Sequence, residues 1–162
     1  MTAKRIEAVL RPASVAVVGA SDKPGSIGEI LCRNLREGGF RGPVFYVNPR
    51  QATIGGAPAF PDVRSLPQAV DLVVIATPPS TLPTVLEHCG ERGVRGVVIV
   101  SAGFREGGDE GAAFERSMLQ VARRYGLRLL GPNSFGLIRT DSGLNAACGG
   151  ALPNPGRLAL VS

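Results

Sequence analysis

Residues 15–28 read VAVVGASDKPGSIG, and this stretch decides the fold class. A short apolar run at 15–18 is followed by Gly19, by small residues, and by a segment with helical patterning that begins near Ile27. The pattern predicts a buried strand, a glycine-rich turn, and a helix whose unpaired N–H groups and positive dipole end face the turn. Small residues let a ligand approach the backbone, and a helix N-terminus favours an anion. We therefore expect a site for a nucleotide-like ligand.

The spacing of the glycines does not identify that ligand. Gly19 is followed by Ala20 and Ser21, so the G-x-G-x-x-G pattern of dinucleotide domains is absent. Five residues separate Gly19 from Gly25, and Ser26 stands where a Walker A loop carries lysine. The alternative to a ligand site is a strand-to-helix connection in which the glycines serve only tight packing.

Length and composition are those of one globular domain. The chain has 162 residues, of which 44% are hydrophobic and 19% are charged. These values allow a substantial core. The longest apolar runs are too short to span a bilayer, and residues 1–11 lack the apolar segment and cleavage site of a signal peptide. We expect a cytoplasmic protein without a membrane partner.

The formal charge of +5 comes from basic residues that are scattered singly or in pairs. With two tyrosines, six phenylalanines and no tryptophan, few aromatic side chains are available to stack on bases. This balance favours a small polyanion over a nucleic acid. The cysteines, Cys32, Cys89 and Cys148, are odd in number and widely spaced, so they indicate neither a disulfide framework nor a metal site.

Apolar runs alternate with helical patterns along the chain. Strands are predicted at residues 15–18, 43–47, 71–76, 96–100 and 127–130, with a short strand pair within 54–61. Helices are predicted at 3–10, 27–37, 80–92 and 109–125, with Asp109 capping the last and Ser65 capping a further brief helix. This alternation is typical of an α/β fold, a doubly wound parallel sheet whose strand-end loops meet at one edge.

Five segments, taken together and in order, carry a family resemblance. They read LRPASVAVVGASDKPGSIG, YVNPR, IATPPS, VSAGFRE and LGPNSFG. This series resembles the N-terminal CoA-binding domain of NDP-forming acyl-CoA synthetases. That domain is similar to the start of the succinyl-CoA synthetase α subunit, and it also occurs in CoA-regulated protein acetyltransferases. The resemblance covers nearly the whole chain from Leu10 onward, and it implies a Rossmann-like fold.

The resemblance implies that coenzyme A lies across the carboxyl edge of the sheet. The residues implied to hold it are Gly19, Ala20, Ser21, Lys23, Pro24, Gly25, Ser26, Ile27, Gly28, Pro49, Arg50, Thr77, Pro78, Pro79, Ser101, Ala102, Gly103, Pro132 and Asn133. Their chemistry is consistent with this role, because CoA carries a pyrophosphate and a 3′-phosphate, and Lys23 and Arg50 are cations in loops. Arg50 is similar to the family's basic residue for the 3′-phosphate. Asn133 would bind the ligand or only fix its own turn.

No catalytic residue is expected in this chain. In the synthetases that it resembles, acyl transfer passes through a phosphohistidine in a following domain, whereas the only histidine here is His88, inside a predicted helix. Ser134 lacks both a G-x-S-x-G elbow and a histidine partner. We therefore predict a CoA-binding domain at 1–155 and the start of a truncated following domain at 156–162, where RLALVS begins a strand.

Three functions are compatible with these features. The first is the module that binds CoA or acyl-CoA in an acyl-CoA synthetase. With its further domains or subunits, such an enzyme converts acyl-CoA, NDP and phosphate into acid, CoA and NTP. The second is a regulatory CoA-binding domain of a protein acetyltransferase. The third is an NADP-binding oxidoreductase domain. An NAD domain usually ends its second strand with Asp or Glu, whereas here Val47 is followed by Asn48, Pro49 and Arg50. Arg50 would still permit NADP.

Overall fold

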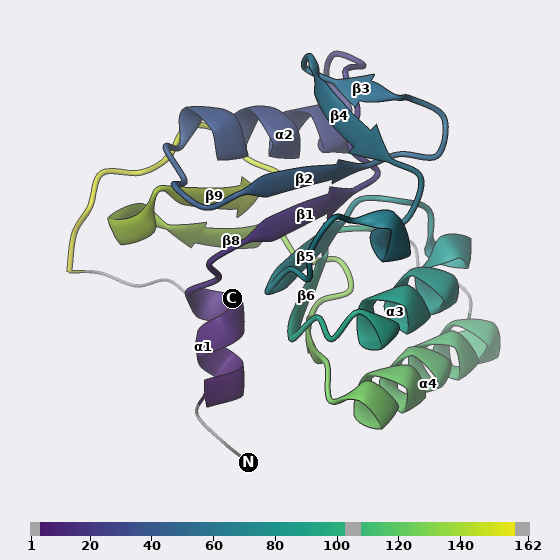
Figure 1. Cartoon of the computed structure of the whole chain (residues 1–162). Coiled ribbons are helices and arrows are strands. Elements are labelled where there is room, and N and C mark those ends of the chain that lie inside the picture. Colours follow the sequence, from purple (N-terminus) through teal and green to yellow (C-terminus); the bar gives the residue numbers. More distant parts are fainter. Residues whose placement is uncertain (1–3, 103–107, 158–162) are drawn as a thin grey trace.

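The computed structural model describes residues 4–102 and 108–157, and a central sheet lies between two covering layers (Figure 1). In chain order the elements are α1 (Lys4–Leu10), β1 (Val15–Val18), α2 (Ile27–Glu37), β2 (Val44–Val47), β3 (Thr53–Ile54), β4 (Ala57–Phe60), the 3₁₀ helix η1 (Val63–Ser65), β5 (Leu72–Ile75), the 3₁₀ helix η2 (Pro79–Thr81), α3 (Leu82–Glu91), β6 (Gly96–Ile99), α4 (Gly108–Tyr125), β7 (Arg128–Leu130), β8 (Gly136–Arg139), the 3₁₀ helix η3 (Thr140–Ser142) and β9 (Leu144–Ala147).

The main sheet has the strand order β3-β4-β2-β1-β5-β6-β7. Only the β3–β4 pair in it is antiparallel. The chain moves outward from β1 to β2 and β4, and it then returns to the opposite side of β1 with β5. Val18 is in register with both Val47 and Ile75, so these three strands end at the same level. The doubly wound parallel sheet expected from the sequence is confirmed, and its strand order reverses between β1 and β5, where such sheets bind ligands.

Two apolar cores flank the sheet because successive strand residues point to opposite faces. On one face, Val73 and Ile75 pack with residues of α3 and α4, including Leu82 and Met118. On the other face, Val74 packs with residues of α1, α2 and the β8–β9 hairpin. All residues of β1, β5 and β6 are buried, which explains why these strands read as continuous apolar runs.

The antiparallel hairpin β8–β9 is the element that the sequence pattern did not predict. It occupies the place that a second covering helix would take beside α2 (Figure 1), and α2 packs against β9. Leu137, Leu144 and Ala146 belong to the same apolar core as Val74 and Val98. All four residues of β9 are buried, so the strand lacks the alternation of apolar and polar residues by which a half-exposed strand is recognised.

Two predicted helix caps are wrong. Asp62 caps η1, because its Oδ1 accepts hydrogen bonds from the backbone N of Ser65 at 2.8 Å and from Ser65 Oγ at 2.7 Å. Ser65 is instead the last residue of that helix. The hydroxyl of Ser65 also lowers the pKa of the Asp62 carboxyl. Because α4 begins at Gly108, Asp109 lies inside the helix and is not its cap.

Other boundaries shift by a few residues or fall outside the described part. The helix predicted at 80–92 begins as the separate turn η2. On α1, Val9 is buried, whereas Ile6 is 54% exposed and Leu10 is 39% exposed. Gly103 and most of the strand expected at 157–162 lie outside the described residues.

Candidate functional site

The loop after β1 is folded as a capped helix start. Ser26 is the N-cap of α2, and its Oγ accepts a hydrogen bond from the backbone N of Glu29 at 3.2 Å. Ser21 Oγ accepts from the backbone N of Lys23 at 3.0 Å, and the carbonyl oxygen of Lys23 accepts from the N of Ser26 at 3.1 Å. These bonds close the loop and leave residues 23–25 exposed at its tip. The first turn of α2 faces the loop with its positive dipole end, which favours an anion there.

Two glycines of this loop are required by close packing. A Cβ on Gly28 would overlap the carbonyl oxygen of Gly19, so α2 packs directly on the end of β1. Gly19 has a φ of +85°, and a Cβ there would lie 2.9 Å from Cγ2 of Thr77. Close packing therefore requires glycine at both positions, whether or not they also contact a ligand. Gly25 differs, because it has a φ of +75° and a Cβ there would have no atom within 4 Å.

Asn48 joins the end of β2 to the loop after β1. Its Nδ2 donates to the carbonyl oxygen of Ala20 at 2.8 Å and to Gln51 Oε1 at 3.1 Å. Its Oδ1 accepts from the backbone N of Arg50 at 2.8 Å, which forms an Asx turn. Pro49 and Arg50 are exposed on this turn. The sequence interpretation treated Asn48 only as a replacement for an acidic residue, although the Asn-Pro pair is itself a signal for such a turn.

Asp22 is a second residue whose role the sequence did not reveal. Its Oδ1 accepts a hydrogen bond from the backbone N of Gly55, between β3 and β4, at 2.8 Å. The two residues are far apart in the sequence, so no local pattern predicts the bond. Together with Asn48, Asp22 fixes the loop after β1 to the β2 side of the sheet.

A second series of hydrogen bonds joins the ends of β5, β6 and β7. Ser101 is buried, and its Oγ donates to the carbonyl oxygen of Thr77 at 2.5 Å. The carbonyl oxygen of Ser101 accepts from the backbone N of Asn133 at 2.9 Å. Thr81 Oγ1 donates to the carbonyl oxygen of Pro78 at 2.8 Å, so the 2.7 Å bond between the two threonine hydroxyls is donated by Thr77. The turn that leads into η2 is thereby fixed.

These two series make one connected edge, which we call the carboxyl edge. It runs from Arg50 through Asn48 and the loop after β1 to Thr77, Ser101 and Asn133, in the spatial order of strands β2, β1, β5, β6 and β7. The structure therefore brings together the strand-end loops that the sequence singled out. Asn133 has a φ of 57°, which is a turn conformation. Fixing its own turn was one of the two roles expected for this residue.

The implied site residues differ in how much surface they present. Lys23, Pro24, Gly25, Pro49, Arg50, Pro78, Ala102 and Asn133 are exposed, and Ile27 is 42% exposed at the start of α2. Ser21, Ser26, Thr77, Pro79 and Pro132 are half-buried. Ala20 is fully buried and Gly28 is buried, so these two shape the loop and offer a ligand little surface.

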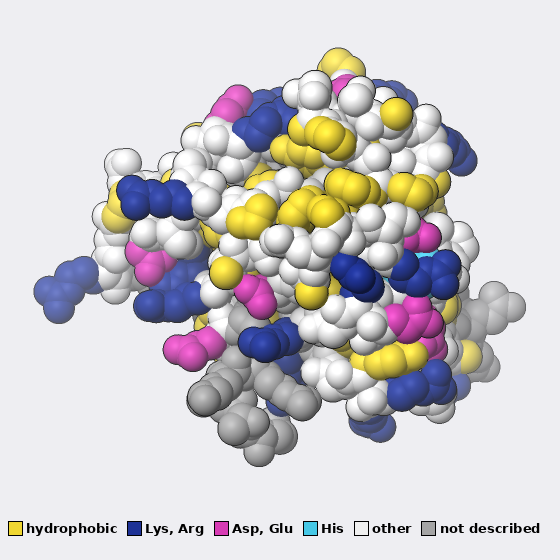
Figure 2. Space-filling view, viewed as in Figure 1, with side chains coloured by type: hydrophobic (Ala, Val, Ile, Leu, Met, Phe, Trp, Pro, Cys, Tyr) yellow, Lys and Arg dark blue, Asp and Glu magenta, His cyan; other side chains and the backbone are white. Residues whose placement is uncertain are grey.

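Charge is unevenly distributed along the carboxyl edge. Lys23 and Arg50 lie at its β1 and β2 end, where Asp22 is also present. The described residues of the loops after β5, β6 and β7, which are 76–81, 101–102 and 131–135, include no charged side chain. Over the face shown in Figure 2, Lys and Arg side chains are spread out and do not form one patch, as the sequence predicted.

The cysteines do not supply a reactive thiolate at neutral pH. Burial raises the pKa of Cys32 to about 11 and that of Cys89 to about 12. Cys148 is half-buried, and burial raises its pKa as well. Within 4–102 and 108–157, no group of His, Cys, Asp and Glu side chains is arranged to hold a metal ion. None of the helices in the same ranges is long and apolar enough to cross a membrane.

The fold and the carboxyl edge define a nucleotide-binding domain of the doubly wound class. Residues 13–140 match the family described as CoA binding domain, and the chain belongs to that family. Its membership confirms the Rossmann-like CoA-binding fold and coenzyme A as the bound molecule, both of which the sequence predicted.

Two known proteins similar to this chain are ADP-forming ligases. The α subunit of acetate–CoA ligase (ADP-forming) I from Pyrococcus furiosus is 44% identical over 161 residues, which cover 97% of this chain and 35% of that protein. Acetate–CoA ligase (ADP-forming) I from Archaeoglobus fulgidus is 43% identical over 157 residues, which cover 97% of this chain and 23% of that protein.

A solved structure shows the same relationship. The dinucleotide-forming acetyl-coenzyme A synthetase 1 of Candidatus Korarchaeum cryptofilum, in complex with phosphate and ADP, superposes with a TM-score of 0.84 and 38% identity. The match covers 90% of this chain and 31% of that one. The chain thus spans between 23% and 35% of the length of these relatives, and it is homologous to one part of the ADP-forming synthetases.

Proposed function

We propose that this chain is the CoA-binding domain of an ADP-forming acyl-CoA synthetase that acts in the cytoplasm. The complete enzyme would convert acyl-CoA, ADP and phosphate into the free acid, CoA and ATP. In that enzyme, the domain at 1–155 would bind CoA or acyl-CoA. It would present the thiol end of the ligand to further domains or subunits. The connected carboxyl edge from Arg50 to Asn133 carries this proposal.

The phosphates of the ligand would lie at the β1 and β2 end of this edge. The loop at 21–26 combines exposed residues, the capped N-terminus of α2 and Lys23, a combination that suits a pyrophosphate. Arg50 is exposed on the neighbouring turn and would pair with the 3′-phosphate. The two cations are thus available to the two phosphate groups from adjacent strands.

The pantetheine arm would lie along the described parts of the loops after β5, β6 and β7, at 76–81, 101–102 and 131–135, which carry no charged side chain. The turn at Thr77 is fixed by hydroxyl bonds, and Ser101 holds it to the next strand, so the wall is rigid before the ligand binds. Rigid walls lower the entropic cost of binding. These residues bind and orient the ligand, and we assign no catalytic residue to the chain.

The relatives and the end of β2 favour the synthetase over the other two functions. The relatives named above are ligases or synthetases by name, which supports this context over a regulatory domain of an acetyltransferase. Asn48 and Arg50 take the place where an NAD domain carries an acidic residue. NADP is therefore the competing ligand that the test includes.

The test compares ligands by the shift that each causes in the melting temperature of the whole chain. CoA at about 100 times its Kd adds about 2.7 kcal/mol to the free energy of unfolding, which is a shift of several degrees for a domain of this size. Dephospho-CoA should bind at least about tenfold more weakly than CoA, because a charge-assisted hydrogen bond is worth about 1.5–3 kcal/mol. NAD and NADP should shift the melting temperature little.

Two variants assign the effect to Arg50. Arg50→Ala should remove most of the difference between CoA and dephospho-CoA, and higher salt should imitate this in part. Arg41→Ala is the matched control, since Arg41 is also exposed but precedes β2 and lies at the opposite edge of the sheet. A larger shift with NADP than with CoA would contradict the proposed function. Equal binding of CoA and dephospho-CoA would remove only Arg50 from the site.

A further inference from the structure

We propose that Phe135 forms the contact surface for the acyl group of a bound acyl-CoA, an inference that rests on the proposed function. Phe135 follows β7 at the carboxyl edge, and it is 64% exposed. No other large hydrophobic residue with a described side chain is more exposed. An aromatic side chain open to solvent at a ligand-binding edge offers apolar area that binding can bury.

The backbone that carries the exposed ring is held on both sides of Phe135. Next to it, the backbone N of Ser134 donates to the carbonyl oxygen of Ile99 at 3.1 Å, and the N of Gly136 donates to Ser134 Oγ at 3.1 Å. The carbonyl oxygen of Phe135 accepts from the N of Cys148 at 2.9 Å. The backbone on both sides of the ring is therefore anchored to the sheet and to β9.

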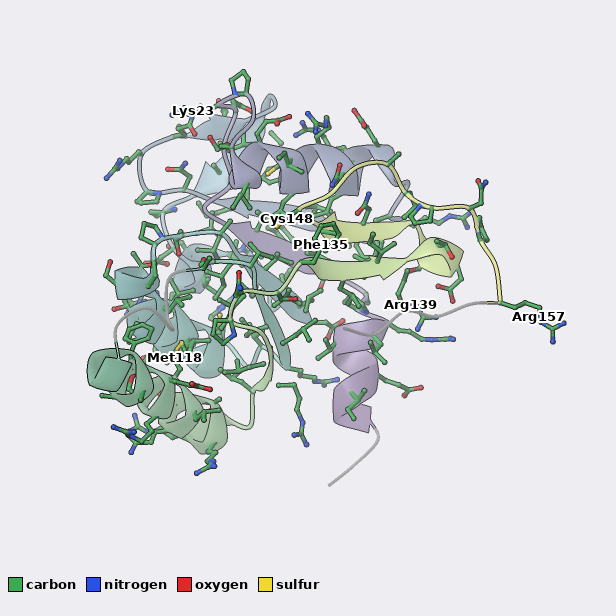
Figure 3. The ribbon with its side chains drawn as sticks, turned by 180° about the vertical axis from the view of Figure 1, so that it is seen from behind. Lys23, Met118, Phe135, Arg139, Cys148 and Arg157 are labelled. Carbon is green, nitrogen blue, oxygen red and sulfur yellow. The ribbon has the colours of Figure 1, made fainter. Side chains whose placement is uncertain are left out.

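The ring itself rests on Gly149. A Cβ at this position would overlap the ring of Phe135, so the absence of a side chain is what makes room for it. Gly149 is fixed in turn, because its carbonyl oxygen accepts from Nδ2 of Asn34 on α2 at 2.7 Å. In Figure 3, Phe135 is seen beside Cys148 and well away from Lys23. The ring thus offers an apolar surface that rests on Gly149 and is carried by an anchored backbone.

The distribution of charge decides which part of the ligand reaches Phe135. The phosphates belong at the β1 and β2 end, with Lys23 and Arg50, and the described loops at the β7 end are uncharged. From β2 to β7 the sheet has four strand spacings, which is about 19 Å at about 4.8 Å each. An elongated ligand held by its phosphates at β2 therefore extends its uncharged arm toward β7. The group on its sulfur then lies near Phe135, and the ring favours an apolar acyl chain.

The first experiment measures Kd by calorimetry for CoA, acetyl-CoA, butyryl-CoA and hexanoyl-CoA, with the whole chain. In the unchanged chain, affinity should rise with acyl length, by up to about fourfold for each methylene that is buried. Phe135→Ala should bring the four affinities close together while CoA itself still binds. Phe135→Leu, which keeps an apolar side chain, should retain most of the increase in affinity with acyl length. Leu119→Ala is the control, because Leu119 is 40% exposed on α4, away from the edge.

Each result of this series decides the inference. Equal affinity of all four ligands for the unchanged chain would overturn the inference. An increase of affinity with acyl length that is unchanged in Phe135→Ala would overturn it too. Both results leave the proposed function intact, because CoA still binds. Failure of the unchanged chain to bind CoA would instead contradict the proposed function, and the inference would fall with it.

A second measurement needs no substitution at Phe135. CoA that carries a nitroxide on its sulfur broadens the NMR signals of nearby amide protons. We expect the amides of residues 134–136 to broaden most, and those of Asn48 and Arg50 to broaden least. The reverse order would show that the sulfur lies at the β2 end, and it would overturn the inference whatever the variants do.

Discussion

Gly19 and Thr77 pack so closely that a Cβ on Gly19 would lie 2.9 Å from Cγ2 of Thr77 and 3.1 Å from the carbonyl group of Ala76. The two residues follow β1 and β5, which are neighbours because the strand order reverses between them. The contact joins the end of the carboxyl edge that carries Lys23 and Arg50 to the loops after β5, β6 and β7, whose described residues carry no charge. The pair therefore lies where the two halves of the site meet.

The first prediction concerns this contact. Gly19→Ala should lower the free energy of unfolding by more than the about 1–2 kcal/mol that left-handed backbone costs an L-residue. The excess arises because the neighbouring carbonyl of Ala76 is backbone and cannot move away. Gly93→Ala is the control, since Gly93 has a φ of +70° and a Cβ there would meet no atom within 4 Å. Urea unfolding measures both.

Adding Thr77→Ser to Gly19→Ala removes the Cγ2 atom and keeps the hydroxyl that bonds Thr81. Part of the lost stability should return in this double variant. Equal costs for Gly19→Ala and Gly93→Ala would show that the close contact adds nothing to backbone strain.

The second prediction concerns Asn48, which should act as a positioning residue for Arg50. Asn48→Ala removes the bonds to Ala20 and Arg50 and should destabilise the chain by about 1–3 kcal/mol. It should also reduce the preference for CoA over dephospho-CoA, although Arg50 is still present. Calorimetry with both ligands measures the preference. Gln51→Ala, which removes only an acceptor of Asn48 Nδ2, is the control and should keep it. An unchanged preference in Asn48→Ala would mean that Arg50 does not depend on this turn.

The third prediction is a loss of stability in alkali. Burial raises the pKa of Cys32 from 9.0 to about 11 and that of Cys89 from 9.0 to about 12. Above pH 9 the unfolded chain therefore loses thiol protons that the folded chain keeps, so the free energy of unfolding falls as pH rises. Below that pH the contribution is fully present. Each thiol adds at most about 1.4 kcal/mol per pH unit to this slope.

Urea unfolding at several pH values between about 8 and 10.5 measures that slope. The variant Cys32→Ala/Cys89→Ala should show a shallower slope, whatever its absolute stability. Cys148→Ala is the comparison, because Cys148 is only half-buried. Equal slopes in all three chains would assign the alkaline loss to other groups.

The fourth prediction concerns Asn34, which holds the β8–β9 hairpin to α2. Its Nδ2 donates to the carbonyl oxygens of Ala147 at 2.9 Å and Gly149 at 2.7 Å. Asn34→Leu leaves both acceptors without this donor and should cost about 1–3 kcal/mol. Asn34→Asp should cost at least as much, because a carboxylate would face two carbonyl oxygens.

Hydrogen exchange locates this effect. The amide of Cys148, which bonds Phe135, should exchange faster in Asn34→Leu than in the unchanged chain. Glu37→Ala, at an exposed position on the same helix, should change neither stability nor exchange appreciably. Undisturbed exchange at Cys148 in Asn34→Leu would show that the hairpin is held by apolar packing alone.

Much of the fold followed from local sequence. The strand predicted at 15–18 and the helix predicted at 27–37 agree with β1 and α2 at both ends. Short apolar runs bounded by polar or glycine positions are typical of buried strands, and helical spacing of apolar residues indicates the covering face of a helix. The β8–β9 hairpin did not follow, because β9 is ordered by packing against α2 and the apolar core and carries little pattern of its own.

The chemistry of the site was also present in the sequence, as a set of loops with small residues and the two cations Lys23 and Arg50. What only the tertiary structure decided is which of these loops touch. The bonds from Asn48 to Ala20 and from Ser101 to Thr77, and the contact of Gly19 with Thr77, all join separate strands. Strand order decides these contacts, and strand order depends on how the two cores pack over the whole chain, so no local pattern contains it.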